Sequence, residues 1–464
     1  MTHDTFRARR AELHRRMGGR AVLLVGTNEN PRTSPHMGYE HRQDSTFWYF
    51  TGCSRPGAAA LIDNSGCTFF LDPPAADDDL WHGHVETLDD LRKLYGVERV
   101  IDTKLLEGAC KGRRLATLAT HDRVRTELAS ALTDRTLVYG EDNGDDRLIE
   151  AVIAMRRVKS AEEIAEHRQA ADATEAAFVT AMAATHVGGN EAHIAALFDA
   201  VLAARGCTTG YHSIVTVRGE VLHNPDYVNP LADGDLLLLD GGGERLASGY
   251  GVDITRTWPV NGSFTGRQRA AYDAVLASQL AAIELCRPGV RYRKVHDASA
   301  RVLAQWLLDE GLLRGSLDAV MESHAAAAFF PHGVGHLLGL DTHDLEQFWD
   351  RAGYAPGRTR ATEFGTCYLR MDLDLVPGFL VTIEPGFYVV PGILRNPELH
   401  DAWGEMVDWD KAHDWVGFGG IRIEDDVLVT AGDPDVITAG TPKDPAAIEE
   451  LVGSGTPALE RLSP

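Results

Sequence analysis

Five side chains in the second half of the chain have the chemistry and the local settings of metal ligands. They are Asp240 in LLLLDGGG, Asp253 in YGVDITRT, His336 in HGVGH, Glu384 in TIEPG and Glu424 in RIEDD. Four carboxylates that share one buried pocket would repel one another or become protonated. Because two divalent cations would balance four negative charges, the set predicts a hydrolase with two metal ions.

Each of these motifs also has a purely structural explanation when it is taken alone. An aspartate between a strand and glycines is usually a turn residue. A histidine pair in a glycine-rich segment such as HGVGH is more often part of a loop than of a metal site, and TIEPG could be a strand that ends in a Glu-Pro turn. The five motifs in this order are far more specific, because a chance sequence would rarely contain all of them.

The segments around the candidate ligands have strand patterns. An apolar run ends at Asp240, and a glycine-rich hairpin over 241–251 turns the chain back. Asp253, Glu384 and Glu424 stand where polar and apolar residues alternate, which places them on the polar face of a strand. A ligand on a strand is held more rigidly than one on a loop, so this arrangement favours a preformed site.

Length and patterning favour two domains, because 464 residues exceed what one hydrophobic core usually organises. Residues 1–157 alternate helical patterns with short apolar strands, which predicts an α/β domain. Ser160 and Glu163 have the spacing of a capping box and would start a long Ala-rich helix over 161–185. We therefore assign residues 158–464 to a second domain, which carries the candidate ligands.

The apolar periodicity predicts further elements in each domain. They are helices over 6–17, 81–95, 267–286 and 294–311, and strands over 21–25, 58–62, 68–71 and 100–101. Residues 112–135 have weak periodicity and are left unassigned. Two stretches, 344–375 and 391–420, have the character of long insertions.

The composition is that of a soluble globular enzyme, with 44% hydrophobic and 24% charged residues. A net charge of −23 disfavours nucleic acid or an anionic membrane as a partner. The six cysteines are scattered without a Cys-X2-Cys pair, which favours free thiols in a reducing compartment. The N-terminal segment is polar and no apolar run reaches membrane-spanning length, so we expect a cytoplasmic protein.

With these motifs together, the chain resembles the pita-bread metallopeptidases, the family of methionine aminopeptidase, aminopeptidase P and prolidase. The segment RQDSTFWYFTG resembles the accessory domain of the proline-specific branch. The resemblance implies an α/β N-terminal domain and an α+β catalytic domain with a curved antiparallel sheet flanked by helices. It also implies two metal ions per subunit, and an oxygen-rich shell with one imidazole suits Mn²⁺, with Co²⁺ or Zn²⁺ as alternatives.

The resemblance implies a role for each candidate site residue. The metal ligands are Asp240, Asp253, His336, Glu384 and Glu424. A hydroxide that bridges the two metal ions would attack the peptide bond, and Glu384 would move its proton. The resemblance further places two imidazoles, His332 and His343, closest to the chemistry. It places His223 in the substrate pocket, and Arg422 would support the site through hydrogen bonds.

The preferred substrate length and the dimer are inferred from two further matches. Arg370, fourteen residues before Glu384, stands where prolidases similar to the human enzyme carry an arginine for the free proline carboxylate. Trp81 resembles a tryptophan that reaches over the partner's active site in prolidase dimers. An exposed arginine and a core or surface tryptophan are the plain alternatives. The matches favour a homodimeric Xaa-Pro dipeptidase acting on small peptides with proline in second position, with an Xaa-Pro aminopeptidase as the alternative.

Two other classes share the pita-bread fold. A non-catalytic relative that only binds in the cleft would typically have lost metal ligands, and a metal-free hydrolase of the creatinase type would lack the Asp-Asp-His-Glu-Glu set. All five residue types are present here, so both classes are disfavoured.

Overall fold

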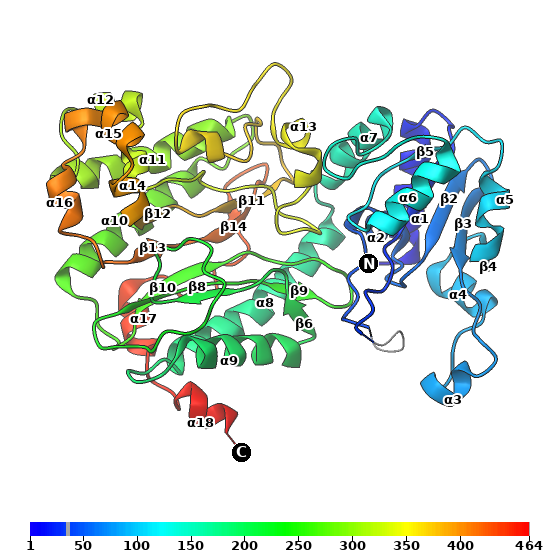
Figure 1. Ribbon diagram of the computed structural model, residues 1–464, viewed down its shortest axis with the longest axis horizontal. Helices are drawn as coiled ribbons and strands as arrows, with labels where there is room; N and C mark the ends of the chain where they lie inside the picture. The colour runs from blue at the N-terminus through cyan, green and yellow to red at the C-terminus, as the bar shows by residue number, and fades with distance from the viewer. Residues whose placement is uncertain (34–37, 464) are drawn as a thin grey trace. The chain divides into compact units, whose positions relative to one another are not determined.

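The computed structural model describes residues 1–33 and 38–463, and these form two compact units (Figure 1). Unit 1 holds Met1–Arg156 together with Leu345–Trp349, and unit 2 holds Arg157–Asp344 and the described residues from Asp350 onward. Nothing in the sequence pattern indicates that Leu345–Trp349 would fold with the first unit. Among the described residues, no helix combines the length and the apolar character that a bilayer crossing requires.

A five-stranded mixed sheet forms the centre of unit 1, with the strand order β4-β3-β2-β1-β5. The strands are β1 (Val22–Val25), β2 (Ala59–Asp63), β3 (Gly66–Leu71), β4 (Arg99–Asp102) and β5 (Ala116–Thr117). The three central strands pair antiparallel, whereas β4 and β5 each run parallel to their neighbour. The strands predicted over 21–25, 58–62, 68–71 and 100–101 are confirmed as β1 to β4. Nearly all residues of β1, β2 and β3 are buried, as their apolar runs indicated.

Helices surround this sheet, and the sequence patterns predicted only part of them. They are α1 (His3–Arg16), α2 (Ser45–Thr51), α3 (Asp78–His82), α4 (Leu88–Tyr95), α5 (Leu106–Cys110), α6 (Arg123–Thr133) and α7 (Asp146–Arg156). The single helix predicted over 81–95 is wrong. Gly83 ends α3 with a positive φ of 72°, and Thr87 and Asp90 form a reciprocal capping box that starts α4 anew.

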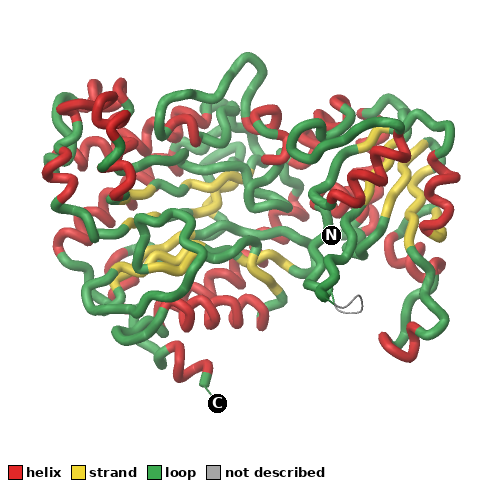
Figure 2. The backbone as a smooth tube through the Cα atoms, in the orientation of Figure 1, coloured by secondary structure: helices red, strands yellow, loops and turns green. Residues whose placement is uncertain are grey.

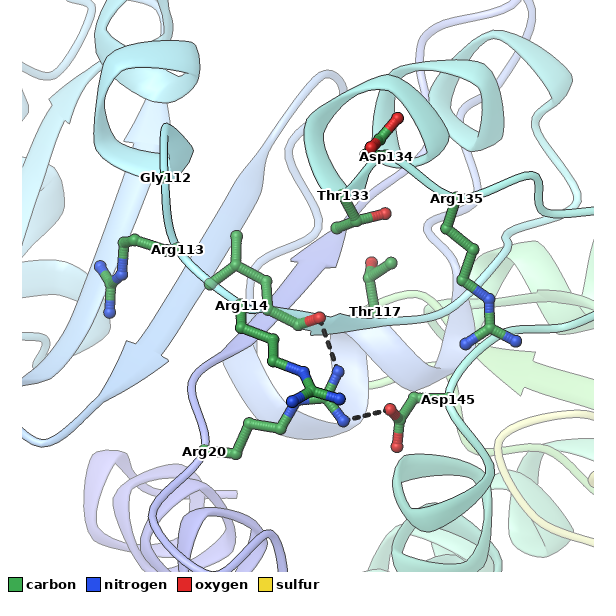
Figure 3. Close-up of a pocket in the computed structure, with 10 residues that line it drawn as sticks. Arg20, Gly112, Arg113, Arg114, Thr117, Thr133, Asp134, Arg135 and Asp145 are labelled. Atoms are coloured by element: carbon green, nitrogen blue, oxygen red, sulfur yellow. Dashed lines mark hydrogen bonds and ion pairs between the residues drawn. The ribbon is translucent and has the colours of Figure 1, made fainter.

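A pocket of about 510 Å³ opens in unit 1 between β5 and the end of α6 (Figure 3). Arg20 donates a hydrogen bond of 2.9 Å to the carbonyl of Leu115 and pairs with Asp145. Arg113 points away from Arg20 toward its own ion-pair partner, Asp63. These guanidinium groups are engaged in holding the unit together, and none of the predicted site residues lines this pocket.

Unit 2 contains small antiparallel sheets between helices (Figure 1). The strands are β6 (Cys207–Thr209), β7 (Ile214–Thr216), β8 (Leu236–Asp240), β9 (Gly243–Arg245), β10 (Thr255–Pro259), β11 (Leu380–Ile383), β12 (Gly386–Tyr388), β13 (Gly420–Arg422), β14 (Asp425–Leu428) and β15 (Asp435–Val436). They form the groups β10-β8-β7, β11-β14-β15, β12-β13 and β6-β9. All of these pairs are antiparallel, as expected for the α+β class.

Helices of unit 2 flank these sheets, and α8 runs beside α9 (Figure 1). They are α8 (Ala161–Ala183), α9 (Glu191–Ala204), α10 (Gly266–Glu284), α11 (Tyr292–Asp309), α12 (Leu317–Ser323), α13 (Asp350–Gly353), α14 (Pro391–Leu394), α15 (Pro397–Trp403), α16 (Trp409–His413), α17 (Pro445–Leu451) and α18 (Ala458–Leu462). The capping box of Ser160 and Glu163 is present at the start of α8, as predicted. Between α12 and β11 the chain is mostly loop (Figure 2).

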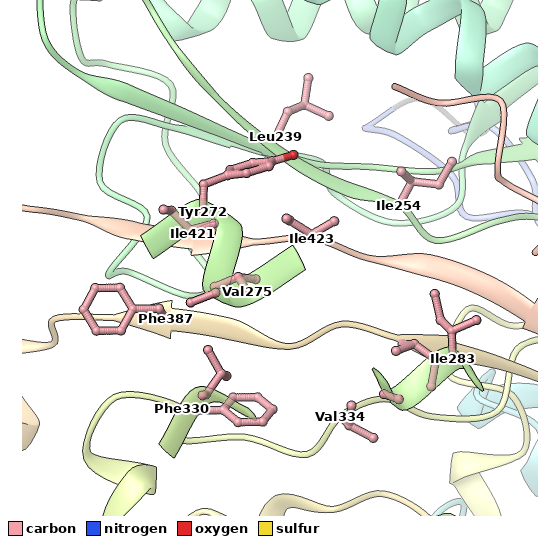
Figure 4. Packing of buried hydrophobic residues seen from close by; sticks show 14 of the residues in the cluster. Leu239, Ile254, Tyr272, Val275, Ile283, Phe330, Val334, Phe387, Ile421 and Ile423 are labelled. Carbon is pink, nitrogen blue, oxygen red and sulfur yellow. The ribbon is translucent and has the colours of Figure 1, made fainter. Parts of the chain in front are cut away.

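One apolar core joins the helices and sheets of unit 2. Figure 4 shows Leu239 of β8, Val275 of α10, Phe387 of β12 and Ile421 of β13 in this core. All four side chains are buried. The strands next to the candidate ligands are therefore anchored by large apolar contacts on one face, which fixes their backbone positions.

Candidate metal centre

The structure brings the five predicted ligands of unit 2 together. Oxygen or nitrogen atoms of Asp240, Asp253 and Glu424 lie within 4.8 Å of one another, and so do those of His336, Glu384 and Glu424. A third group on the same criterion joins Asp253 and His336 to His343. The groups share members, so the side chains form one continuous cluster that could hold two cations with shared carboxylates.

The ligand carboxylates stand at the ends of strands, and the expectation that three of them lie within strands is wrong. Asp240 is the last residue of β8, and Asp253 lies two residues before β10. Glu384 follows β11, and Glu424 lies between β13 and β14. At these breaks the backbone changes partner: the Glu384 N–H donates to the carbonyl of Val334 at 2.8 Å instead of continuing the sheet.

His336 has the tautomer that a metal ligand needs. Its Nδ1 lies 3.0 Å from the carbonyl oxygen of Leu337, which requires a proton on Nδ1 and leaves the lone pair on Nε2. Nε2 is 3.4 Å from an oxygen of Asp253 and 3.7 Å from an oxygen of Glu384. Because the ring is only 2% exposed, Nε2 faces these two carboxylates and not the solvent.

A glycine next to His336 makes this position possible. Gly335 has a φ of 155°, and a Cβ there would lie 2.1 Å from the carbonyl oxygen of Thr382 and 2.5 Å from the hydroxyl of Tyr292. The His336 N–H then donates to the Thr382 hydroxyl at 3.0 Å. The second glycine of HGVGH therefore lets the histidine segment approach β11 closely enough for His336 to reach the carboxylates.

The cluster has more negative charge than its own residues can balance. Burial raises the pKa of Glu424 well above its usual range, and the neighbouring carboxylate of Asp253 raises it further. Burial also raises the pKa of Glu384 to about 7. Arg422 brings one positive charge, with its Nη2 2.5 Å from Asp240. The donor set therefore fits divalent cations, which would supply the missing positive charge and allow all four carboxylates to ionise.

Tyr211 belongs to the site although the sequence did not indicate it. Its hydroxyl lies 2.5 Å from one oxygen of Asp240 and also contacts Asp253. A phenol has one proton, so it can donate to one of these carboxylates at a time. A tyrosine in a loop, as in TTGYHS, has no pattern that distinguishes it from an ordinary surface or core residue.

Arg422 donates hydrogen bonds to several groups around the cluster. Its Nε donates to the hydroxyl of Thr255 at 3.0 Å, and that hydroxyl donates to Glu424 at 2.6 Å. Its Nη1 donates to the hydroxyl of Tyr388 at 3.0 Å. Arg422 thus links Asp240 to Glu424 through Thr255, which orients two candidate ligands at once.

His332 lies beside Glu384 in a fixed orientation. Its Nδ1 is 2.8 Å from the carbonyl oxygen of Gly333 and its Nε2 is 2.9 Å from the hydroxyl of Tyr388. Nδ1 is also 3.9 Å from an oxygen of Glu384. Burial, together with the charge of Arg422, lowers the pKa of His332 to about 3, so this imidazole is neutral near neutral pH.

The remaining predicted residues occupy different positions. His343 is exposed, and its ring centroid lies 4.4 Å from that of His336. His223 is exposed too, but partial burial and the charges of Arg422 and Arg370 lower its pKa, so Arg370 lies within electrostatic reach of it. Trp81 lies on α3 of unit 1 and is 70% exposed, and its proposed role at a partner's active site stays a prediction.

The fold and the cluster match a known family. The chain belongs to metallopeptidase family M24, whose model matches residues 165–431. The model of the aminopeptidase P N-terminal domain matches residues 6–115. The resemblance to the proline-specific pita-bread metallopeptidases is thereby confirmed, and the first match spans all five candidate ligands.

Relatives and solved structures agree with this membership. A probable Xaa-Pro aminopeptidase of Verticillium alfalfae is 32% identical over 424 residues, which cover 89% of this chain and 88% of the relative. The human Xaa-Pro dipeptidase is 29% identical over 447 residues, which cover 93% and 88%. The structure of Pseudomonas aeruginosa aminopeptidase PepP superimposes with a TM-score of 0.80 at 27% identity, covering 97% of this chain and 98% of that one. Zinc-substituted aminopeptidase P of E. coli in complex with product gives 0.79 at 28% identity over the same shares.

Proposed function

We propose that this chain is a two-metal hydrolase of Xaa-Pro peptides and that Xaa-Pro dipeptides are its preferred substrates. The observation that carries the proposal is the cluster of four carboxylates around Nε2 of His336, which lacks the positive charge to keep all four carboxylates ionised at once. The names of the relatives, Xaa-Pro aminopeptidase and Xaa-Pro dipeptidase, support the substrate class.

The metal ions would be held by Asp240, Asp253, His336, Glu384 and Glu424, and four carboxylates with one imidazole suit Mn²⁺. When bound, such cations lower the pKa of water and polarise the scissile carbonyl. Glu384 would accept the proton of the attacking water and pass it to the leaving proline nitrogen.

The imidazoles around the cluster would orient and stabilise the substrate. His332 is neutral and is fixed by Gly333 and Tyr388, so it would act through its position and its hydrogen bonds and not by changing charge. His343 is exposed beside His336 and could donate a hydrogen bond to the developing oxyanion. His223 would line the substrate pocket.

The preference for dipeptides rests on Arg370. A dipeptide presents a free proline carboxylate next to the scissile bond, and a guanidinium binds a carboxylate with two parallel hydrogen bonds. The influence of Arg370 on the pKa of His223 supports a position near the pocket. An Xaa-Pro aminopeptidase that accepts longer peptides is the second candidate, because aminopeptidases predominate among the relatives.

The deciding experiment compares proline release from an Xaa-Pro dipeptide with cleavage of the matching Xaa-Pro-Yaa tripeptide by the manganese-loaded protein. A higher kcat/KM for the dipeptide, together with a rise in its KM in Arg370→Ala, supports the dipeptidase. A higher kcat/KM for the tripeptide supports the aminopeptidase. Absence of cleavage of both substrates by protein with confirmed bound metal would contradict the proposed function.

Homodimerisation, with Trp81 of one subunit reaching the other subunit's active site, and a cytoplasmic location are part of the same proposal. Both rest on the resemblance to prolidases and on the residue patterns of the chain. Sedimentation of the protein and of Trp81→Ala, together with their kcat/KM values, would test the role of this tryptophan. A dimeric Trp81→Ala with unchanged activity would contradict it.

A further inference from the structure

We propose that Arg256 is a positioning residue that holds the metal-ligand segments around Asp253 and Glu424 in register with each other. The inference rests on the proposed metal site and concerns how this chain builds it. Asp253 lies two residues before β10, and Glu424 lies between β13 and β14, so the two carboxylates come from segments that are far apart in sequence. Their relative position must be set by contacts between those segments.

Every N–H of the Arg256 guanidinium is used for this purpose. The side chain is 0% exposed. Its Nε donates to the carbonyl of Pro442 at 3.0 Å, its Nη1 to the carbonyls of Thr255 at 2.9 Å and Glu424 at 2.5 Å, and its Nη2 to the carbonyl of Thr441 at 2.9 Å and to Asp425 at 2.7 Å. A planar group with five fixed donors and five acceptors defines the positions of all the segments that it contacts.

Two of these acceptors, the carbonyls of Thr255 and Glu424, lie in the segments that carry the candidate metal ligands. The backbone of Glu424 is bound on both sides, because its N–H donates to the carbonyl of Thr255 at 3.0 Å while its own carbonyl accepts from Arg256. The hydroxyl of Thr255 donates to the Glu424 carboxylate at 2.6 Å. Because Thr255 is only two residues from Asp253, a shift of either segment would break these bonds and separate the two ligands.

Asp425 is the counterion of the buried Arg256 guanidinium. One of its oxygens accepts from Arg256 and from the hydroxyl of Thr438 at 2.9 Å. The other accepts from Gln279 at 3.0 Å and from Lys443 at 2.6 Å. Burial alone would raise the pKa of Asp425, but the charges of Arg256 and Lys443 hold it below its usual value. Asp425 is therefore an ionised counterion with all of its acceptor positions occupied, and it is not a metal ligand.

The three consecutive acids of the motif RIEDD thus have three different tasks. Glu424 faces the metal cluster, and Asp425 neutralises Arg256. Asp426 accepts the backbone N–H of Asp253 at 3.1 Å, which is a further connection between the same two segments. Arg256 therefore has two roles that substitutions can distinguish. Its charge neutralises Asp425, and its four hydrogen bonds to carbonyl groups position the segments that carry the ligands.

The test measures Mn²⁺ affinity, by competition with a metal-binding dye, beside the free energy of unfolding of the metal-free protein. Arg256→Met leaves the buried Asp425 with Lys443 as its remaining charged partner, so both quantities should fall. Arg256→Met/Asp425→Leu removes both buried charges, and the ammonium of Lys443, whose side chain is 21% exposed, can be hydrated by solvent. We expect the double variant to regain stability relative to Arg256→Met while its Mn²⁺ affinity stays about 10- to 100-fold below that of the unsubstituted protein, as for other residues that orient metal ligands.

Two controls keep the outcome unambiguous. Leu303→Ala empties a buried position on α11 and should lower stability with normal Mn²⁺ affinity. Arg256→Lys keeps the charge but cannot reach all of the carbonyls, so this variant should also bind Mn²⁺ more weakly. If the methionine variants do not fold, the Mn²⁺ affinity of Arg256→Lys tests the inference alone. Normal Mn²⁺ affinity in the double variant or in Arg256→Lys would overturn the inference. Failure of the unsubstituted protein to bind Mn²⁺, or normal binding by Asp253→Ala, would instead overturn the proposed metal site.

Discussion

Lys159 and Asp344 form an ion pair inside unit 2, with Nζ 3.1 Å from Oδ2 and both side chains 1% exposed. Lys159 stands just before α8, and its backbone N–H donates to the carbonyl of Gly378 at 2.8 Å. Asp344 directly follows His343, and its N–H donates to the carbonyl of Leu337 at 3.0 Å. The pair therefore fixes the loop that carries His343 to the start of the long helix.

Breaking this pair should destabilise the protein strongly, because the remaining charge would stay buried after losing this ion pair. Asp344→Asn and Lys159→Met should each lower the free energy of unfolding by about 3–5 kcal/mol. Chemical denaturation of the metal-free protein measures this loss. Lys159→Met/Asp344→Leu should recover much of it, and single variants as stable as the unsubstituted protein would show that the pair is not held in place.

The raised pKa of Glu384 predicts a pH dependence of the metal-free protein. In the folded state the carboxyl holds its proton to about pH 7, against 4.5 for the ordinary group, so the folded state binds more protons between these values. The contribution of Glu384 to stability is fully present below pH 4.5 and is lost as pH rises through about 7. The difference in unfolding free energy between the unsubstituted protein and Glu384→Gln should therefore fall over this window.

Mn²⁺ binding should reverse this behaviour, because a bound cation favours the ionised carboxylate. Binding near pH 6 should then release protons from the cluster. Calorimetric titration in buffers with different ionisation enthalpies measures the released protons, and the same titration of Glu384→Gln should show fewer of them. Equal proton release by both proteins would contradict the assignment of the raised pKa to Glu384.

Removal of the Tyr211 hydroxyl should weaken metal binding without unfolding the protein. Tyr211→Phe keeps the ring and loses the hydrogen bonds that orient Asp240 and Asp253. We expect Mn²⁺ affinity to fall about 10-fold, as for other residues that orient ligands, with a parallel loss of kcat/KM at limiting metal. Tyr227→Phe, which removes a hydroxyl bonded to the carbonyl of Ser213, is the matched control and should bind Mn²⁺ normally.

His332 should influence the rate without setting its pH dependence. Because its pKa is lowered to about 3, it stays neutral over the pH range in which the cluster functions. His332→Ala should lower kcat and leave the acid limb of the kcat/KM profile at the same pH. Tyr388→Phe, which removes the hydrogen bond to Nε2, should have a smaller effect of the same kind. A shift of the acid limb in His332→Ala would identify this imidazole as the titrating group.

Local patterns predicted the parts of the structure that local interactions determine. The capping box of Ser160 and Glu163 marked the first turn of α8 because all of its hydrogen bonds lie within four residues. The five candidate ligands were identifiable because each stands in a short motif, and the structure brings them together. The break between α3 and α4 was missed, although Gly83 and the Thr87–Asp90 spacing contained the signal.

The supporting residues could not be predicted in the same way, because their roles depend on contacts between distant segments. Tyr211 meets Asp240 across 29 residues, and Lys159 meets Asp344 across 185. Arg256 stands inside a recognised motif, but its acceptors include carbonyls 168 to 186 residues away. Sequence spacing has no information about such pairs until the fold has brought them together.

The five residues Leu345–Trp349 have a consequence for how the protein can be divided. They follow Asp344 directly in the chain, yet they fold with unit 1, where Gln347 accepts a hydrogen bond from Asn143 and Trp349 donates one to Gly140. A shortened protein that starts at Arg157 would lack Asn143 and Gly140, with which this segment forms these hydrogen bonds. We therefore expect that unit 2 does not fold fully on its own: melting of unit 1 should loosen the chain immediately after Asp344, so that heat inactivation and loss of the N-terminal unit coincide.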